Sequence, residues 1–202
     1  MSLELIKFDP AHPEQAFSRC KEVILSGGVI AYPTDTFYGL GVDPRNGAAV
    51  KKLFLIKGRR ADQPILLLIP DQAVVKEWAE EITPRAARLM DKFWPGPLTL
   101  VFKAKKDVLP ELTAGTGAIG LRVPGSALTR QLLAYLGSAL TGTSANISGG
   151  RGIETAEEAR ETFGGRVDLV LDGGRTPGGK PSTVVDVSTD LPRVIREGAT
   201  TL

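Results

Sequence analysis

The sequence predicts a fold of the α/β or α+β class with a mixed β-sheet, on three observations. Segments typical of strands and of helices are intermixed from one end of the chain to the other. The strands do not alternate strictly with helices, so we expect a mixed sheet and not a purely parallel one. A length of 202 residues and a hydrophobic content of 42% suit one medium-sized domain, residues 1–202, with a proper core.

Helices are expected where apolar residues recur at helical spacing between a capping residue and a glycine or other stop signal. Asn46, Thr83 and Ser126 are the predicted N-caps of three of them, and Thr155 with Glu158 forms a capping box. The expected helices span residues 13–25, 47–57, 71–79, 83–93, 126–136 and 155–163.

Strands are expected at short apolar or alternating runs, which span residues 3–8, 29–32, 65–69, 98–102, 118–123, 169–171, 183–187 and 194–196. The second of these leads into Pro33-Thr34-Asp35-Thr36-Phe37-Tyr38-Gly39-Leu40-Gly41, a polar stretch closed by glycines. Open α/β sheets place ligand contacts at strand ends of this kind. We therefore expect residues 33–41 to form part of a binding site.

The composition argues against several classes of protein. A single cysteine, Cys20, excludes an internal disulfide and suggests a reducing compartment. With His12 as the single histidine, neither a structural zinc site nor a Ser-His-Asp triad is expected. The net charge of +2 and the short apolar runs point to neither a nucleic acid nor a membrane, and we expect a cytoplasmic protein.

Two glycine-rich stretches resemble nucleotide-binding motifs without meeting their structural requirements. Residues 115–120 match G-x-G-x-x-G, but a strand follows them where the dinucleotide fingerprint needs a helix. Residues 174–180 approach a P-loop, but Pro181 stands where a Ser or Thr should reach magnesium. Both are interpreted as turns.

Polar stretches follow several of the predicted strands, and together they suggest one anionic ligand. Hydroxyls without a histidine base suit ligand orientation, and well-spaced cations suit a carboxylate plus a polyphosphate. Such a site would act by positioning and charge neutralisation, usually with magnesium on the phosphates. The stretches are Thr34-Asp35-Thr36, Lys57-Gly58-Arg59, Leu98-Thr99, Arg122, Thr143-Ser144-Ala145-Asn146, Pro181-Ser182-Thr183 and Arg196-Glu197-Gly198.

These stretches, extended to residues 33–41, 94–99 and 122–124, resemble in order the motifs of the YrdC/TsaC family over nearly the whole chain. The resemblance implies an open, twisted mixed sheet flanked by helices around a deep electropositive cavity, in the short single-domain form of the family. It implies synthesis of threonylcarbamoyl-AMP and pyrophosphate from L-threonine, bicarbonate or CO2, and ATP with Mg²⁺. This is the first step of the N6-threonylcarbamoyladenosine modification at tRNA position 37.

The resemblance also implies roles for individual residues. The threonine would be held by Arg122, Thr34 and Ser182, with Tyr38 and Thr143 lining the site. The ATP would be held by Lys57, Arg59, Ser144, Asn146 and Arg196, with Thr113 as a weaker candidate, and no metal ligand from the protein is expected. One departure concerns Leu68, in a strand where some relatives carry a histidine near the threonine.

Two other functions remain open at this point. One is an RNA-binding module of the same fold, although aromatic residues make up only 6% of the chain and Phe54, Trp78 and Phe93 lie on helical faces typical of a core. The other is carbamoyl transfer, because a related domain occurs in much longer hydrogenase-maturation proteins. As further partners we expect tRNA or a downstream threonylcarbamoyl transferase complex.

Overall fold

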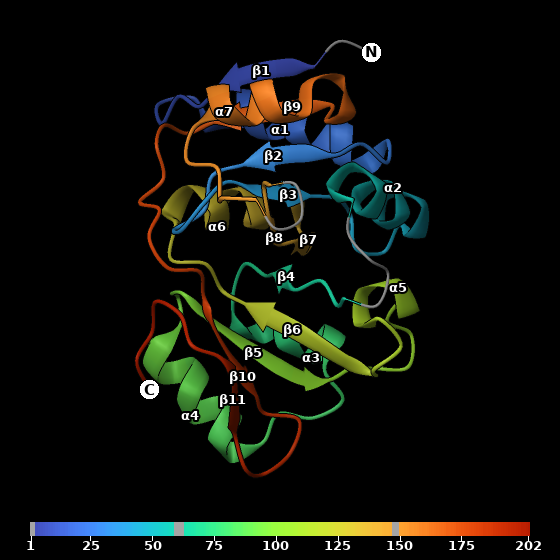
Figure 1. The fold of residues 1–202 in the computed structure, drawn as a ribbon, viewed down its shortest axis with the longest axis vertical. Helices are drawn as coiled ribbons and strands as arrows, with labels where there is room; N and C mark the ends of the chain where they lie inside the picture. Colours follow the sequence, from blue (N-terminus) through green and yellow to red (C-terminus); the bar gives the residue numbers. More distant parts are fainter. Residues whose placement is uncertain (1–2, 59–62, 147–149) are drawn as a thin grey trace.

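The computed structural model describes residues 3–58, 63–146 and 150–202, and Figure 1 shows their arrangement. The strands are β1 (Glu4–Lys7), β2 (Ile30–Tyr32), β3 (Gly39–Gly41), β4 (Leu67–Leu68), β5 (Leu98–Lys103), β6 (Ala118–Arg122), β7 (Leu140–Thr141), β8 (Thr143–Ser144), β9 (Leu169–Asp172), β10 (Thr183–Asp186) and β11 (Arg193–Arg196). The α-helices are α1 (Pro13–Leu25), α2 (Gly47–Lys57), α3 (Val75–Trp78), α4 (Pro84–Phe93), α5 (Pro110–Thr113), α6 (Ala127–Leu136) and α7 (Ala156–Phe163). Two 3-10 turns, η1 (Gln72–Val74) and η2 (Gly164–Arg166), complete the set.

The strands form two mixed sheets, so the predicted mixed α/β class is confirmed with its strands divided between them. One sheet has five strands in the order β1-β9-β2-β3-β8, and the other has six in the order β11-β10-β5-β6-β4-β7. In the first, β1, β9 and β2 are parallel, whereas β3 and β8 are antiparallel to their neighbours. In Figure 1 the first sheet occupies the upper part of the molecule, and the second lies below it with the C-terminus.

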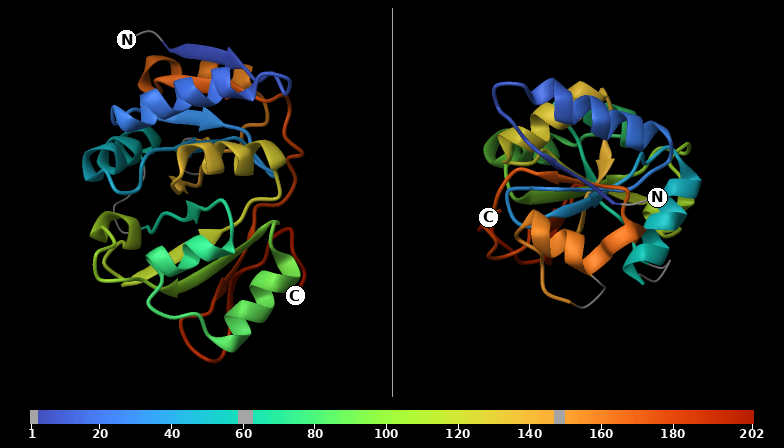
Figure 2. Two further views of the ribbon diagram at one scale, coloured as in Figure 1. Left: turned by 180° about the vertical axis from the view of Figure 1, so that it is seen from behind. Right: turned by 90° about the horizontal axis from the view of Figure 1, so that it is seen from above.

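Helices cover the outer faces of both sheets. The two views in Figure 2 show α1 and α7 on opposite faces of the five-stranded sheet, and both helices contact β9 and β2. Around the six-stranded sheet, Figure 2 places α3 and α4 on one side. Among the described residues, no helix is long and apolar enough to cross a membrane.

The predicted helix caps account for where the longer helices begin. The side chains of Asn46, Thr83 and Ser126 accept hydrogen bonds from the backbone N–H three residues later, at 3.1–3.2 Å. Thr155 does the same for the N–H of Glu158, but the Glu158 carboxylate accepts from the N–H of residue 154. The predicted capping box is therefore half formed, with its second bond shifted by one residue.

Other elements differ from the prediction because backbone partners elsewhere interrupt them. Only Leu67–Leu68 of the expected strand 65–69 is assigned as strand, and the N–H of Ile65 donates to the carbonyl of Leu112. The expected helix 71–79 is the turn η1 followed by the short α3, which stops where Ala79 forms a bridge with Ala104. The strands β3, β7 and β8 and the helix α5 are too short for a periodic pattern to predict.

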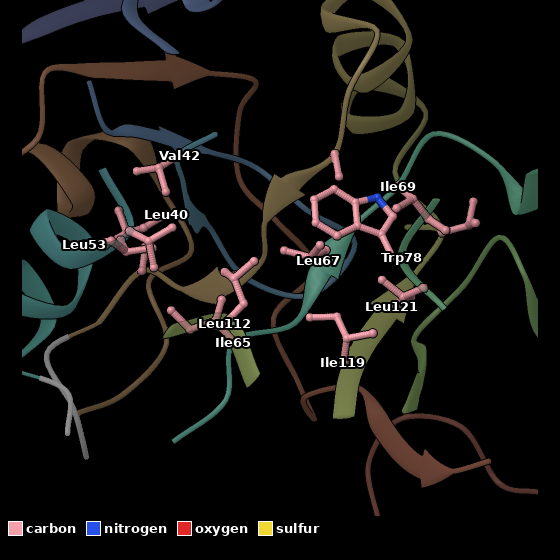
Figure 3. Packing of buried hydrophobic residues seen from close by; sticks show 14 of the residues in the cluster. Leu40, Val42, Leu53, Ile65, Leu67, Ile69, Trp78, Leu112, Ile119 and Leu121 are labelled. Carbon is pink, nitrogen blue, oxygen red and sulfur yellow. The ribbon is translucent and has the colours of Figure 1, made fainter. Parts of the chain in front are cut away.

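A hydrophobic core runs across both sheets and joins them. Leu40 of the first sheet and Leu67 and Leu121 of the second belong to one continuous cluster of buried side chains. Figure 3 shows this cluster extending from Leu53 of α2 to Trp78 of α3. The two sheets are thereby held at a defined separation, which matters because the candidate site lies between them.

One of the crossings between the two sheets, from β7 to β8, takes a single glycine. β7 pairs with β4 in the six-stranded sheet, β8 pairs with β3 in the five-stranded sheet, and Gly142 lies between them. A Cβ at Gly142 would lie 2.5 Å from Leu66 Cδ1 and 2.8 Å from Leu68 Cγ, closer than real contacts allow. The absence of a side chain at Gly142 therefore lets β7 and β8 turn against β4.

Candidate active site

A cavity of about 530 Å³ is lined by residues of both sheets. On the six-stranded sheet its walls follow the alternation of side chains along each strand, because every second residue points to the same face. Three strands supply such sets: Thr99 and Val101 of β5; Ala118, Gly120 and Arg122 of β6; Ser182, Val184 and Asp186 next to and within β10.

A bulge in the edge strand β11 adds two consecutive side chains to the same wall. Val184 of β10 is opposite Arg196, whereas the next residue, Val185, is opposite Val194, so one residue of β11 is extra. Such an insertion locally re-aims the side chains beside it. Ile195 and Arg196 both line the cavity as a result, together with Arg193.

The five-stranded sheet supplies the polar loop before β3 and the strand β8. Thr34 lines the cavity, and its hydroxyl donates to the carbonyl of Phe37 at 2.6 Å and accepts from the N–H of Thr36 at 3.2 Å. Thr143 and Ser144 reach the cavity from β8, which pairs with Gly39 and Leu40. The hydroxyl of Thr34 thus holds the loop in shape at the rim of the cavity.

Arg122 is a buried cation at the end of β6, only 5% exposed. Its Nε donates to the carbonyl of Gly96 at 2.9 Å, and its Nη2 lies 2.5 Å from Oδ2 of Asp35. The two groups form an ion pair that is not aligned for a hydrogen bond, and neither Nη2 nor the Asp35 oxygens have a hydrogen-bond partner among the described residues. Nε and Nη2 are thus occupied by Gly96 and Asp35, and Nη1, which has no hydrogen-bond partner among the described residues, remains for an anion in the cavity.

Ser182 links a second cation to the same wall. Its hydroxyl lies 2.9 Å from Oγ1 of Thr99, and Arg196 donates to its carbonyl at 2.8 Å and to its hydroxyl at 3.2 Å. Burial, and then the neighbouring charge of Arg122, lower the pKa of the Arg196 guanidinium from its ordinary value. Two guanidinium groups that repel each other in this way form a site where an anion is favoured.

Lys57, at the end of α2, binds the end of β8 and the residues just after it. Its side chain is 2% exposed, and its Nζ donates to the carbonyls of Ser144 and Asn146 and to Oδ1 of Asn146, at 2.5, 2.9 and 3.0 Å. Ser144 donates its own hydroxyl to the same Oδ1 at 2.7 Å. Lys57, Ser144 and Asn146 are thus brought together, although only Ser144 lines the cavity. Arg59 lies outside the described residues.

The structure therefore brings together many of the residues that the sequence singled out, but not all of them. Thr113 is buried in α5 with its hydroxyl donated to the carbonyl of Pro110, and it is not among the lining residues, whereas Thr116 is. Tyr38 lines the cavity but donates its hydroxyl to the carbonyl of Gly174, and burial raises the pKa of that phenol. The candidates that line the cavity are Thr34, Tyr38, Arg122, Thr143, Ser144, Ser182 and Arg196.

Sequence reasoning singled out Arg196 but missed the other cavity residues of β10 and β11, which are Val184, Asp186, Arg193 and Ile195. Alternation counted from Ser182 would have found Val184 and Asp186, because residues two apart in a strand share a face. The local sequence does not predict the bulge in β11. That bulge brings Ile195 and Arg196 to one wall of the cavity. Thr99, which hydrogen-bonds Ser182, was noticed only as part of a polar stretch.

The lining carries more positive than negative charge. Arg122, Arg193 and Arg196 face it with Asp186, which lies 3.7 Å from Arg193. Among the described residues, no group of three or more His, Cys, Asp and Glu side chains could hold a metal ion. The arrangement can bind an anion at Arg122 and another at Arg196, with hydroxyls between them to orient the ligands.

Comparison with known proteins agrees with this geometry. The Sua5–YciO–YrdC family model, described as telomere recombination, matches residues 22–198. A threonylcarbamoyl-AMP synthase of Thiobacillus denitrificans is 41% identical over 163 residues, which cover 81% of this chain and 86% of that protein. The threonylcarbamoyl-AMP synthase of Bacillus subtilis is 37% identical over 174 residues, which cover 86% of this chain.

A solved structure shares the fold over nearly the whole chain. The crystal structure of P. abyssi Sua5 complexed with L-threonine superposes with a TM-score of 0.91 at 32% identity and covers 98% of this chain. The chain spans about half the length of the longer relatives, with 50% of the Bacillus protein and 58% of the P. abyssi chain covered. On the family model and these identities, the chain belongs to the Sua5–YciO–YrdC family.

Proposed function

We propose that this chain condenses L-threonine, bicarbonate or CO2, and ATP to threonylcarbamoyl-AMP and pyrophosphate. The observation that carries the proposal is the cavity in which Arg122 and Arg196 lie close enough for their charges to interact, with Ser182 hydrogen-bonded to Arg196. A carboxylate and a polyphosphate are two anions that such a pair of guanidinium groups suits. The relatives named threonylcarbamoyl-AMP synthase and the Sua5 structure with L-threonine support the same assignment.

In this proposal the amino acid binds on the Arg122 side of the cavity. The free donors of the Arg122 guanidinium would bind the threonine carboxylate, and the hydroxyl of Ser182 would orient the amino acid. The apolar lining beside them includes Leu68, which pairs with Arg122 across β4 and β6. Leu68 offers no proton donor or acceptor, so the proposed chemistry needs none at that position.

The nucleotide would bind on the side of Arg196 and Ser144. Arg196 would neutralise charge on the phosphates, with Arg59 as a further candidate. Lys57 would act through the segment that it holds, because its hydrogen bonds go to Ser144 and Asn146. Mg²⁺ would arrive with the ATP phosphates, since the described residues offer no cluster of metal ligands, and it would supply charge neutralisation there.

The chemistry then needs orientation and charge neutralisation but no protein nucleophile. The neutral threonine amine forms a C–N bond to CO2 and loses a proton, which gives an N-carboxylate. An oxygen of that carboxylate attacks the α-phosphorus of ATP, the bond to the β-phosphate oxygen breaks, and pyrophosphate leaves. The two arginines would reduce the repulsion between carboxylate and phosphate as they approach each other.

The condensation would be the first step of tRNA N6-threonylcarbamoyladenosine synthesis, and a downstream transferase would consume its product. An RNA-binding module is not favoured by the structure, because RNA recognition generally uses exposed aromatic side chains. Phe54 and Trp78 are buried in the hydrophobic core, and Phe93 packs against it.

Pyrophosphate release tests the proposal directly. With ATP, Mg²⁺ and bicarbonate, the purified chain should release little pyrophosphate until L-threonine is added, because without threonine there is no nucleophile for the α-phosphorus. L-Serine should react more slowly but measurably, since one methyl group discriminates by only about 1–3 kcal/mol. Release at the same rate without any amino acid would refute the synthase assignment, and so would no release from folded protein that binds both ATP and threonine.

A further inference from the structure

The ion pair between Asp35 and Arg122 stands out among the polar contacts of the molecule. The side chains are 15% and 6% exposed, and they meet at 2.5 Å behind the wall of the cavity. Arg122 lines the cavity, whereas Asp35 is not among the lining residues. Both carboxylate oxygens of Asp35 are buried, so Asp35 contacts the guanidinium without presenting an oxygen to the cavity.

Two contacts together determine the orientation of the Arg122 guanidinium relative to the cavity. Nε donates to the carbonyl of Gly96, and Nη2 lies against Asp35. Gly96 is itself held in place, because its N–H donates to the carbonyl of Val123 at 2.9 Å. A guanidinium has five N–H donors in a planar fork, so fixing one side of the fork leaves the remaining donors pointing in one direction.

The surroundings of Asp35 are built to admit its carboxylate. A Cβ placed on Gly125 would lie 2.9 Å from Oδ2 of Asp35, so a side chain at that position would push the carboxylate. Gly125 does not have the positive φ that would by itself require glycine. The missing side chain at Gly125 is therefore explained by the space that Asp35 occupies.

The Asp35 carboxylate also compensates positive charge near the cavity. Arg122 and Arg196 lie near enough for their charges to interact, and a buried cation without a counter-ion is strongly unfavourable. Asp35 compensates Arg122 without entering the space where a ligand would bind. A carboxylate in that position compensates the buried charge of Arg122 and leaves its remaining donors for a ligand.

We propose that Asp35 is the positioning residue for Arg122, which it holds in the orientation that binds the substrate carboxylate. This inference rests on the proposed function, because it concerns the threonine side of that site. Asp35 does not touch the substrate, and its effect is exerted through Arg122 alone. Its loss should therefore weaken amino-acid binding selectively, not ligand binding in general.

The test uses Asp35→Asn, which keeps the shape of the side chain and removes its charge. Calorimetric titration of the folded variant should give a Kd for L-threonine raised by at least about tenfold, a size typical of removing a partner that orients a ligand-binding group. The Kd for ATP should stay within about twofold of wild type, as expected for an effect through one side chain. A purely structural role would lower the melting temperature and leave both affinities unchanged.

A second variant moves the carboxylate without removing it. Gly125→Ala should displace Asp35 and lose part of the threonine affinity, again with ATP binding retained. Two matched controls should bind threonine as wild type does. In Gly47→Ala the new Cβ lies 3.7 Å from Leu109, an ordinary contact, and Asp168→Asn breaks the ion pair with Lys52 away from the cavity.

The outcomes separate this inference from the proposed function. Wild-type protein that binds no threonine would refute the function and the inference together. Wild-type binding with unchanged threonine affinity in Asp35→Asn or in Gly125→Ala would overturn the inference alone. Equal losses of threonine and ATP affinity would also overturn it, since they would indicate general damage to the site.

Discussion

Replacing Lys57 with methionine should destabilise the protein and weaken ATP binding together. The substitution Lys57→Met keeps the aliphatic length of the side chain and removes its three donors. Among the described contacts, those donors bind the carbonyls of Ser144 and Asn146 and the amide oxygen of Asn146, at the end of β8 and just after it. Because Lys57 is 2% exposed, the side chain that replaces it stays buried, next to oxygen atoms that lose their donor.

The size of the effect follows from those contacts. A hydrogen bond to a charged group typically contributes about 1.5–3 kcal/mol, and because these contacts are only partly buried we take about 1 kcal/mol for each, or about 3 kcal/mol in all. Removing a buried charge returns part of its desolvation cost, which offsets some of that loss. A net destabilisation of about 2 kcal/mol is expected, and this lowers the melting temperature of a chain of this size by about 4–8 °C.

Thermal unfolding of wild type, Lys57→Met and Lys51→Met measures the effect. Lys51 is the matched control on the same helix, because its side chain is 69% exposed and forms a surface ion pair with Glu111. That variant should change stability by less than about 0.5 kcal/mol. A double-mutant cycle of Lys57→Met with Asn146→Ala should then show coupling, since the two side chains touch. If Lys57→Met and Lys51→Met unfold at the same temperature, the contacts of Lys57 stabilise nothing and the reasoning fails.

Two further predictions concern buried groups. The Cys20 thiol should resist alkylation in native protein at pH 8 and react after unfolding. Burial raises its pKa to about 12 from an ordinary value near 8.5. Rapid labelling of the folded protein, measured by mass spectrometry, would contradict this prediction. Gly142→Ala should lower the free energy of unfolding by about 1–3 kcal/mol, because its Cβ would overlap Leu66 and Leu68; in chemical denaturation, a midpoint equal to wild type would show that these side chains give way freely.

Much of the fold could be predicted from the sequence, because local signals determine it. The start of α6 follows from the hydroxyl of Ser126, and its end at Gly137 follows from a left-handed backbone that glycine adopts easily. Short elements could not be predicted in this way. The strands β7 and β8 have two residues each and are defined by partners in different sheets, which no local pattern reveals.

The sequence was enough to predict which residues take part in the candidate site, but not how most of them contact one another. Arg122, Ser182 and Arg196 carry chemistry that sequence reasoning can single out, and all three line the cavity. No local pattern indicates that Lys57 contacts Ser144 and Asn146, because the contact with Ser144 joins residues 87 positions apart. The role of Asp35 was hidden for the same reason, since it depends on the approach of the loop before β3 to the end of β6.

The two arginines of the cavity differ in a way that bears on which anion each one binds. Arg122 already has a carboxylate at 2.5 Å, whereas Arg196 has no carboxylate within 4.0 Å among the described residues and donates to neutral oxygens of Ser182. The charge of Arg196 is therefore the less compensated of the two. A polyphosphate, with several negative charges, gains more beside Arg196, and a single carboxylate suits Arg122, where planar donors matter more than net charge. This division supports placing ATP beside Arg196 and threonine beside Arg122, with Ser182 hydrogen-bonded to Arg196 in the same cavity.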